Sequence, residues 1–274
     1  MLAPPTSVYQ PFVVDDRVVG WITTERARRL VREPVFRASR GRIALKPDFA
    51  TPEARNAALG EVARALAAEG ALTAWRNERY AVAAAPGGEL LFEIERAAAR
   101  YFGIHTYAAH ANGLVGDKAQ WRMWLARRSP AKAIDPGLLD NLVGGGIAAG
   151  SDVASTLVKE AWEEAGLPAD LARCAESAGS VEICRDQPDG LQRETIYVHD
   201  LWLPAAFVPR NQDGEAVEHR RCAPEAVLEV LGSDDITADA SMVVVDFLLR
   251  RGHIAPNDPG FGTLDSLRRC SRPR

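Results

Sequence analysis

Cysteine is scarce in this 274-residue chain, and its four cysteines never stand in a C-x-x-C pair. Such spacing indicates neither a zinc site nor a disulfide framework. Long apolar runs are also missing, because no stretch approaches the roughly 20 apolar residues that a membrane-spanning helix needs. The N-terminus has no basic residue ahead of an apolar run, so it does not resemble a signal peptide. These absences lead us to expect a cytoplasmic protein with reduced thiols and no membrane partner.

An excess of positive charge is absent as well. The formal net charge is −4, whereas nonspecific binding to nucleic acid depends on a basic surface that releases counterions. We therefore expect no nucleic-acid partner. A homodimer is compatible with this composition.

The composition is that of a globular protein with a substantial core. Hydrophobic residues make up 47% of the chain, and this length favours about two domains. We place a small α+β domain at residues 1–104 and a second domain at residues 105–274. No stretch rich in Pro, Gly or Ser separates them, so we expect a fixed interface.

Helical periodicity is clear over residues 152–165. Apolar residues recur there at the spacing of one helix face, namely Ala154, Leu157, Val158, Ala161 and Ala165. Ser151 is a suitable N-cap, and Gly166 is suited to end the helix in a left-handed conformation. The pattern predicts one amphipathic helix, well defined at both ends.

Three carboxylates share this helix. Glu160, Glu163 and Glu164 stand at i, i+3 and i+4, so they are neighbours on its surface, where like charges repel. A hard cation would turn that repulsion into attraction, and oxygen ligands suit Mg²⁺, with Mn²⁺ as a substitute. The alternative is a solvated acidic face. Glycines upstream, including Gly144 and Gly145, are interpreted as a flexible loop beside the carboxylates and favour the metal site.

The whole segment resembles the Nudix box, G-x5-E-x7-R-E-U-x-E-E-x-G-U, in which U is a bulky apolar residue. Seven of the nine specified positions match, from Gly145 to Leu167, with Ala161 as a small residue at a U position. Ser151 replaces the first Glu, and Lys159 replaces the Arg, so a bidentate hold on a carboxylate is lost. The resemblance implies that Glu160, Glu163 and Glu164 bind metal. It also implies a Nudix α/β/α sandwich with a mixed sheet, an α/β (α+β) fold, after the N-terminal domain.

Further stretches resemble one Nudix branch, the one related to the Nudix domain of fungal thiamin pyrophosphokinases. They cover residues 108–113, 209–215 and 243–252. The resemblance implies a small-molecule diphosphate substrate, namely thiamin diphosphate or its oxidised and damaged analogues, cleaved to the monophosphate and phosphate. It also accounts for Ser151 and Lys159, and for an N-terminal region that ordinary Nudix enzymes lack. Nothing in spacing or composition names the group attached to the diphosphate.

Residues outside the helix complete the expected chemistry. By position, Glu215 best matches the base or extra metal ligand that many Nudix enzymes take from a loop. Glu218 is the reserve candidate, and Glu163 or Glu164 could serve instead. The cations expected to face phosphate groups are Arg127, Arg128 and Lys132, with solvated surface as the alternative for each.

Two predictions concern substrate contacts upstream of the box. Trp75 and Arg76 could stack on a heteroaromatic ring and hold an anion, although a core aromatic and a local ion pair would give the same pattern. His110 lies in an apolar strand and is either a satisfied core residue or part of the pocket. We also expect one helix from Pro52 to Ala68 and another over residues 91–100.

Three other functions remain open. The box equally permits a broader pyrophosphatase for nucleoside diphosphates linked to sugars or to other nucleotides. An isopentenyl diphosphate isomerase would use a cysteine near the first core strands, but no cysteine precedes Cys174. A ligand sensor without activity is disfavoured because all three box glutamates are present.

Overall fold

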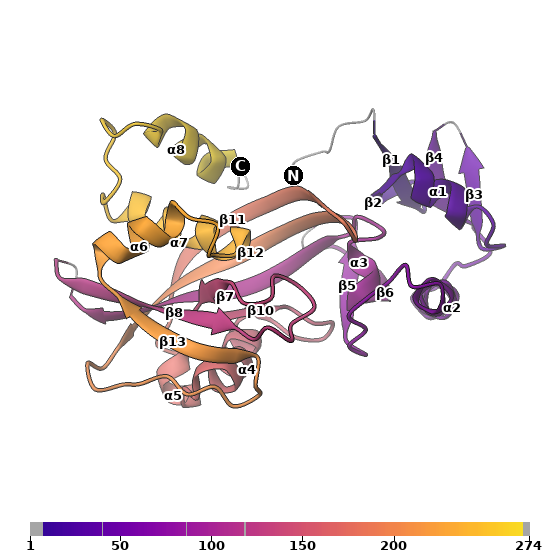
Figure 1. Cartoon of the computed structure of the whole chain (residues 1–274). Helices are drawn as coiled ribbons and strands as arrows, with labels where there is room; N and C mark the ends of the chain where they lie inside the picture. The colour runs from indigo at the N-terminus through magenta and orange to yellow at the C-terminus, as the bar shows by residue number, and fades with distance from the viewer. Residues whose placement is uncertain (1–7, 40, 86, 118, 271–274) are drawn as a thin grey trace.

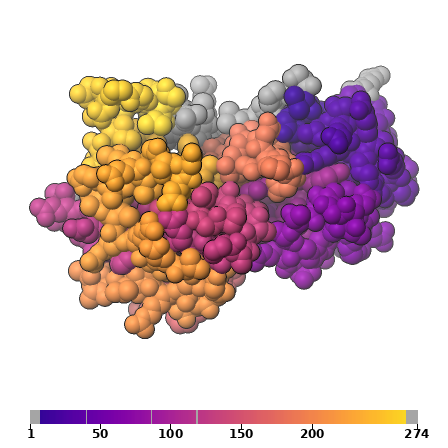
Figure 2. Space-filling view, viewed as in Figure 1, coloured from indigo at the N-terminus to yellow at the C-terminus, as the bar shows by residue number. Residues whose placement is uncertain are grey.

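The computed structural model describes residues 8–39, 41–85, 87–117 and 119–270, which form two parts in contact (Figure 1). In Figure 1 the N-terminal part lies to the right of the larger sheet of the C-terminal part, and Figure 2 shows the same view with all atoms as spheres. The expected boundary between residues 104 and 105 falls where the first strand of that larger sheet begins. No helix in the described ranges is long and apolar enough to cross a membrane.

The N-terminal part combines a four-stranded sheet, a two-stranded sheet and three helices. The four-stranded sheet has the order β2-β1-β4-β3, and β5 pairs with β6. The apolar core between these elements is centred on Phe12, Phe92 and Phe102, each fully buried. The elements are β1 Tyr9–Val14, β2 Arg17–Thr23, α1 Thr24–Leu30, β3 Phe36–Ser39, β4 Arg42–Leu45, α2 Pro52–Ala68, β5 Arg79–Ala83, β6 Leu90–Glu95 and α3 Arg96–Ala99.

The C-terminal part is built on a mixed sheet with the order β11-β12-β7-β8-β13. Strands β12 and β7 run parallel, whereas the other neighbours are antiparallel, and β9 and β10 pair with β8 and β7. The elements are β7 His105–Gly116, β8 Trp121–Arg128, β9 Leu139–Asn141, β10 Val143–Gly146, α4 Val153–Ala165, α5 Ala169–Ala172, β11 Glu176–Gln187, β12 Gly190–Leu203, β13 Ala216–Cys222, α6 Pro224–Leu231, α7 Ala238–Arg250 and α8 Phe261–Cys270.

Helices cover both faces of this sheet (Figure 1). Helix α4 packs Leu157 and Ala161 against Ala109 and Ala111 of β7 on one face. On the other face α6 and α7 pack against strands β7 and β8 in a separate apolar cluster. This is the α/β/α sandwich with a mixed sheet that the sequence predicted, preceded by a small α+β domain.

Two local expectations about helices have opposite outcomes. Helix α2 has the predicted bounds, because Thr51 accepts a hydrogen bond from the N–H of Ala54 and Pro52 begins the first turn. The prediction of a helix over residues 91–100 is wrong for most of that range. Residues up to Glu95 form β6, and only α3 is helical. Pairing with β5, in which Phe92 lies opposite Val82, decides this conformation.

A buried histidine gives the fold a predicted sensitivity to acid. His105 Nε2 is 2.8 Å from Thr195 Oγ1, and its buried Nδ1 has no hydrogen-bond partner among the described residues. Burial lowers the pKa of His105 to about 4, with help from the charge of Arg193. Because the unfolded chain takes up this proton at higher pH, stability falls as pH drops from about 6.5 towards 4.

We expect the lowered pKa of His105 to reduce the free energy of unfolding by about 2 kcal/mol at pH 5 relative to neutral pH. His105→Gln does not titrate, so its melting temperature should fall less between pH 7 and pH 5 than that of the wild type. Thermal melts of both proteins across this range measure the difference. Equal losses in the two proteins would show that another group controls the acid response.

Candidate functional site

The glycines ahead of α4 form strand β10, so the expectation of a flexible loop is wrong. Gly144, Gly145 and Gly146 pair with β7, and successive residues face opposite sides of the sheet. An added Cβ at Gly144 would lie 2.9 Å from the His110 ring, one at Gly145 2.3 Å from Glu160 Cδ, and one at Gly146 2.2 Å from the Tyr80 hydroxyl. The run is glycine because three side chains approach the backbone closely.

Helix α4 is fixed at both ends by its own residues. Asp152, rather than the expected Ser151, is the N-cap, and it forms a capping box with Ser155. The reason is that Asp152 is the residue with extended backbone whose carboxylate accepts the N–H of Ser155, at 2.7 Å. Gly166 ends the helix with φ 63°, as predicted. The caps hold the three glutamates in a defined orientation beneath β10.

Glu160 lies against Gly145 of β10, and its side chain is 12% exposed. Lys159 Nζ is 2.9 Å from Glu160 Oε1 and 2.7 Å from Glu163 Oε2, so one ammonium group bridges two carboxylates. Burial raises the pKa of Glu160 despite this partner. Burial alone would lower the pKa of Lys159, but its bonds to Glu163 and Glu160 outweigh it and raise the pKa. The pair of carboxylates is therefore a place where positive charge is stabilised.

The carboxyl group of Glu164 is buried beside the same strand. The backbone N–H of Gly144 donates to Glu164 Oε2 at 2.8 Å. Burial raises the pKa of Glu164 well above its usual value, and the negative charges of Glu160 and Asp140 add to the effect. A carboxyl group held in this way takes up a proton more readily than an exposed one.

The donor set of the three glutamates suits a hard divalent cation. Carboxylate oxygens are the preferred ligands of Mg²⁺ and Mn²⁺, and the Lys159 ammonium already takes up a cationic position between two of them. In the described ranges, however, no three His, Cys, Asp or Glu side chains are arranged to hold a metal as they stand. The residues therefore fit a divalent cation in chemistry, and the structure shows no coordination geometry for it.

A cleft lies on the other face of β10, between the two parts of the chain. Tyr80, Arg96 and Arg100 line it from the N-terminal part, and Gly144, Gly145 and Gly146 form part of its wall. Its empty space is about 1100 Å³, including space open to solvent. The cleft is therefore lined by residues of both parts of the chain.

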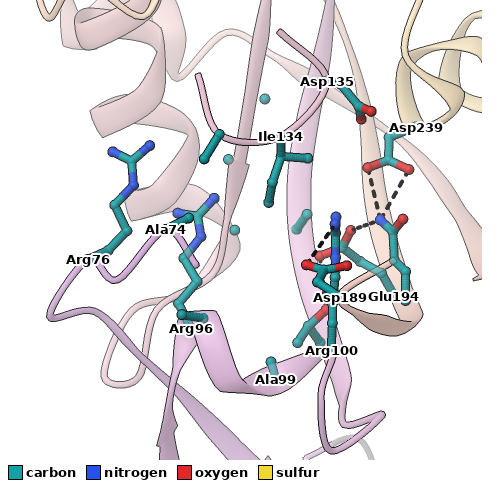
Figure 3. Close-up of a pocket in the computed structure, with 18 of the residues that line it drawn as sticks. Ala74, Arg76, Arg96, Ala99, Arg100, Ile134, Asp135, Asp189, Glu194 and Asp239 are labelled. Atoms are coloured by element: carbon teal, nitrogen blue, oxygen red, sulfur yellow. Dashed lines mark hydrogen bonds and ion pairs between the residues drawn. The ribbon is translucent and has the colours of Figure 1, made fainter. Parts of the chain in front are cut away.

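Charges of both signs line the cleft, and Arg100 lies beside Asp189 and Glu194 (Figure 3). Figure 3 shows Arg76 and Arg96 on one side, and Asp135 and Asp239 on the other. Gln192 Nε2 donates to Asp239 Oδ2 at 3.0 Å and to Glu194 Oε2 at 3.1 Å. Burial raises the pKa of Glu194, and the nearby charge of Asp239 raises it further. The cleft thus offers cations to an anionic group and carboxylate oxygens to hydrogen-bond donors.

Four of the predicted contact residues line this cleft: Arg76, His110, Arg128 and Lys132. Arg128 donates to Asp140 Oδ2 at 2.8 Å and to two backbone carbonyl groups of the loop before β9, so its guanidinium group holds that loop in place. Two predicted residues do not line the cleft. Arg127 pairs with Asp235, and the 37% exposed Trp75 donates to Asn77 Oδ1 at 2.8 Å.

His110 is held in the cleft wall by a buried chain of polar groups. Its Nδ1 is 2.9 Å from Asn141 Oδ1, and Asn141 Nδ2 donates to Asn112 Oδ1 at 3.3 Å. Asn112 in turn donates to Asp200 Oδ1 at 3.2 Å, and the pair of Asp200 with Arg250 closes the chain. His110 is therefore both a satisfied buried residue and part of the cleft, so both interpretations of the sequence hold.

The two loop glutamates considered as a base have different surroundings. Glu215 pairs with Arg76 Nη1 at 2.9 Å and with Lys132. Burial would raise the pKa of Glu215, but these two cations outweigh it and lower the pKa. Glu218 lies on β13 with its side chain 46% exposed, and it pairs with Arg220 outside the cleft lining. Neither glutamate belongs to the lining, but both cations that pair with Glu215 do, so the geometry favours Glu215 over Glu218.

Several residues of the cleft were not predicted from the sequence. They are Arg96, Arg100, Asp140, Gln192, Glu194 and Asp239. A usable signal existed for Gln192 and Glu194, because polar side chains in a strand that is otherwise buried on both faces need a partner or a function. For Arg96 and Arg100 no signal existed, since their position depends on how the two parts pack together.

Comparison with known proteins matches both parts of the chain. Residues 5–106 match a family described as a domain of unknown function, DUF4743, and residues 106–240 match the NUDIX domain. Nudix hydrolase 24, chloroplastic, of Arabidopsis thaliana is 38% identical over 263 residues, covering 94% of this chain and 72% of that protein. Nudix hydrolase 20, chloroplastic, of the same plant is 35% identical over 263 residues, covering 92% and 70%.

Solved structures resemble the chain less. The crystal structure of DR0079 from Deinococcus radiodurans has 20% sequence identity and a TM-score of 0.45, covering 62% of this chain and 98% of that one.

Proposed function

The chain belongs to the Nudix hydrolase family, and from this premise we propose that it cleaves thiamin diphosphate, or its oxidised and damaged analogues, in a reaction that needs Mg²⁺. The observation that carries the proposal is the position of β10. One face of this strand contacts Glu160 of helix α4, and the other lines the cleft between the two parts. The carboxylates and the cleft thus adjoin the same short strand, and the charges of Asp140 and Lys132 in the cleft lining act on Glu164.

The chemistry that Mg²⁺, held by Glu160, Glu163 and Glu164, supplies in such a site is neutralisation of the diphosphate oxygens and activation of a bound water. The protein's own groups perform the remaining tasks. Glu164 has the raised pKa of a group that can accept the proton of the attacking water. Lys132 lies at the cleft, where a cation can hold the developing negative charge.

The charge distribution in the cleft supports the choice of substrate. Thiamin diphosphate joins an anionic diphosphate to a positively charged thiazolium ring and an aminopyrimidine. Arg76 and Arg96 on one side of the cleft match the anion, whereas Asp135, Glu194 and Asp239 on the other match a cation that also donates hydrogen bonds. The stretches that resemble the thiamin-related branch point to the same class.

Phosphate release from a substrate panel tests this proposal. The panel holds thiamin diphosphate, its oxidised analogues, ADP-ribose, nucleotide sugars and dinucleotides, each with and without Mg²⁺. Because nucleoside diphosphate compounds can yield two monophosphates, products are also identified by chromatography. We expect release from the thiamin compounds with Mg²⁺ only. Turnover of the nucleotide compounds alone would replace the substrate by the broader class, and no turnover at all would favour a sensor.

A further inference from the structure

One carboxylate at the edge of the cleft lies between two cations that come from different parts of the chain. Arg76 Nη1 of the N-terminal part is 2.9 Å from Glu215 Oε1, and Lys132 Nζ of the C-terminal part pairs with Glu215 Oε2. Arg76 and Lys132 both line the cleft, whereas Glu215 does not belong to its lining. Two cations therefore converge on one anion at the edge of the space that a substrate would fill.

The backbone around Glu215 holds this arrangement in place. The Glu215 carbonyl accepts from the N–H of Ser129 at 2.8 Å, and the N–H of Lys132 donates to the Ser129 carbonyl at 3.0 Å. In the N-terminal part, the N–H of Arg76 donates to Glu95 Oε1 at 3.0 Å. The side chains of Arg76 and Glu215 are 43% and 28% exposed, so this pair is open to solvent and easily exchanged.

We propose that Arg76 and Lys132 form a phosphate-binding site divided between the two parts of the chain, and that the Glu215 carboxylate occupies it when no substrate is bound. This inference rests on the proposed function. A phosphate group carries more negative charge than one carboxylate and accepts more hydrogen bonds, so it competes effectively for both cations. Binding of the substrate then releases Glu215.

In this arrangement the N-terminal domain has a defined task. This domain supplies Arg76 and brings its guanidinium group close to Lys132, on the same Glu215 carboxylate. Displacement by the substrate also explains how Glu215 is inert in the free protein and available once substrate arrives. While it is paired, its pKa is lowered and it is a weak base; once displaced, it loses both partners.

Binding of inorganic pyrophosphate to the full chain, measured by calorimetry in EDTA at low ionic strength, tests the site without metal and without turnover. Glu215→Gln removes the internal competitor, so Kd should fall about tenfold relative to the wild type. Arg76→Ala should raise Kd, and it should do so by a larger factor in the Glu215→Gln background, where Arg76 is no longer occupied. Glu69→Gln, which breaks an exposed pair with Arg29 in the N-terminal part, is the matched control and should leave Kd unchanged.

Whether Glu215→Gln lowers or raises the Kd for pyrophosphate distinguishes an internal competitor from a ligand or structural residue. If Glu215 were only a ligand or a structural residue, its loss would weaken pyrophosphate binding or leave it unchanged, and either result overturns the inference. Melting temperatures of all variants show that each is folded. Because no hydrolysis is measured, a failed substrate panel with tighter binding in Glu215→Gln would reject the proposed reaction but keep the phosphate site.

Discussion

Glu164→Gln should lower kcat by about a thousandfold while leaving the fold intact. The Gln side chain has nearly the same shape, and its amide oxygen can still accept the N–H of Gly144 that now donates to Glu164 at 2.8 Å. What the substitution removes is the negative charge and the ability to take up a proton. Both are needed if Glu164 binds Mg²⁺ or acts as the base.

Steady-state kinetics with the best substrate of the panel, together with circular dichroism and thermal melts, measure this effect. The matched control is Glu61→Gln, which changes an exposed glutamate of helix α2 and should retain wild-type kcat. Because burial makes the charged form of Glu164 unfavourable in the metal-free protein, its neutral replacement should not lower the melting temperature in EDTA. A folded Glu164→Gln protein with normal turnover would remove Glu164 from the active site.

Gly145→Ala should lower kcat by about a hundredfold with little loss of stability. The new Cβ would lie 2.3 Å from Glu160 Cδ and 2.4 Å from its Cγ, distances that no real contact allows. The backbone of β10 is held by β7, so the Glu160 side chain has to give way and its pair with Lys159 is disturbed. The carboxylate therefore moves out of position, and the fold accommodates the methyl group.

Kinetics and thermal melts of Gly145→Ala separate the two effects. Gly60→Ala is the control, because an added Cβ there meets only the end of the Arg64 side chain at 3.6 Å. This glycine lies inside helix α2, so its replacement should stabilise the protein by about 0.5–1 kcal/mol and leave kcat unchanged. Wild-type kcat in Gly145→Ala would show that the position of Glu160 against β10 is unimportant for catalysis.

Elements with a strong local signal were predictable. Helix α4 follows from the apolar spacing that includes Leu157 and Ala161 and from Gly166 at its end, and α2 follows from Thr51 and Pro52. Elements without such a signal were not. A run of glycines has no side-chain pattern, so β10 could not be distinguished from a loop. Residues 90–95 became a strand because β5 offers a pairing partner, which local propensity cannot foresee.

The candidate site divides in the same way. The sequence by itself determined the family and the three carboxylates, because Glu160, Glu163 and Glu164 lie within two turns of one helix and their spacing fixes their neighbourhood. Only the tertiary structure decided that Arg76 meets Glu215, which is 139 positions further along the chain. Such a contact depends on the packing of two domains, and no local pattern encodes it.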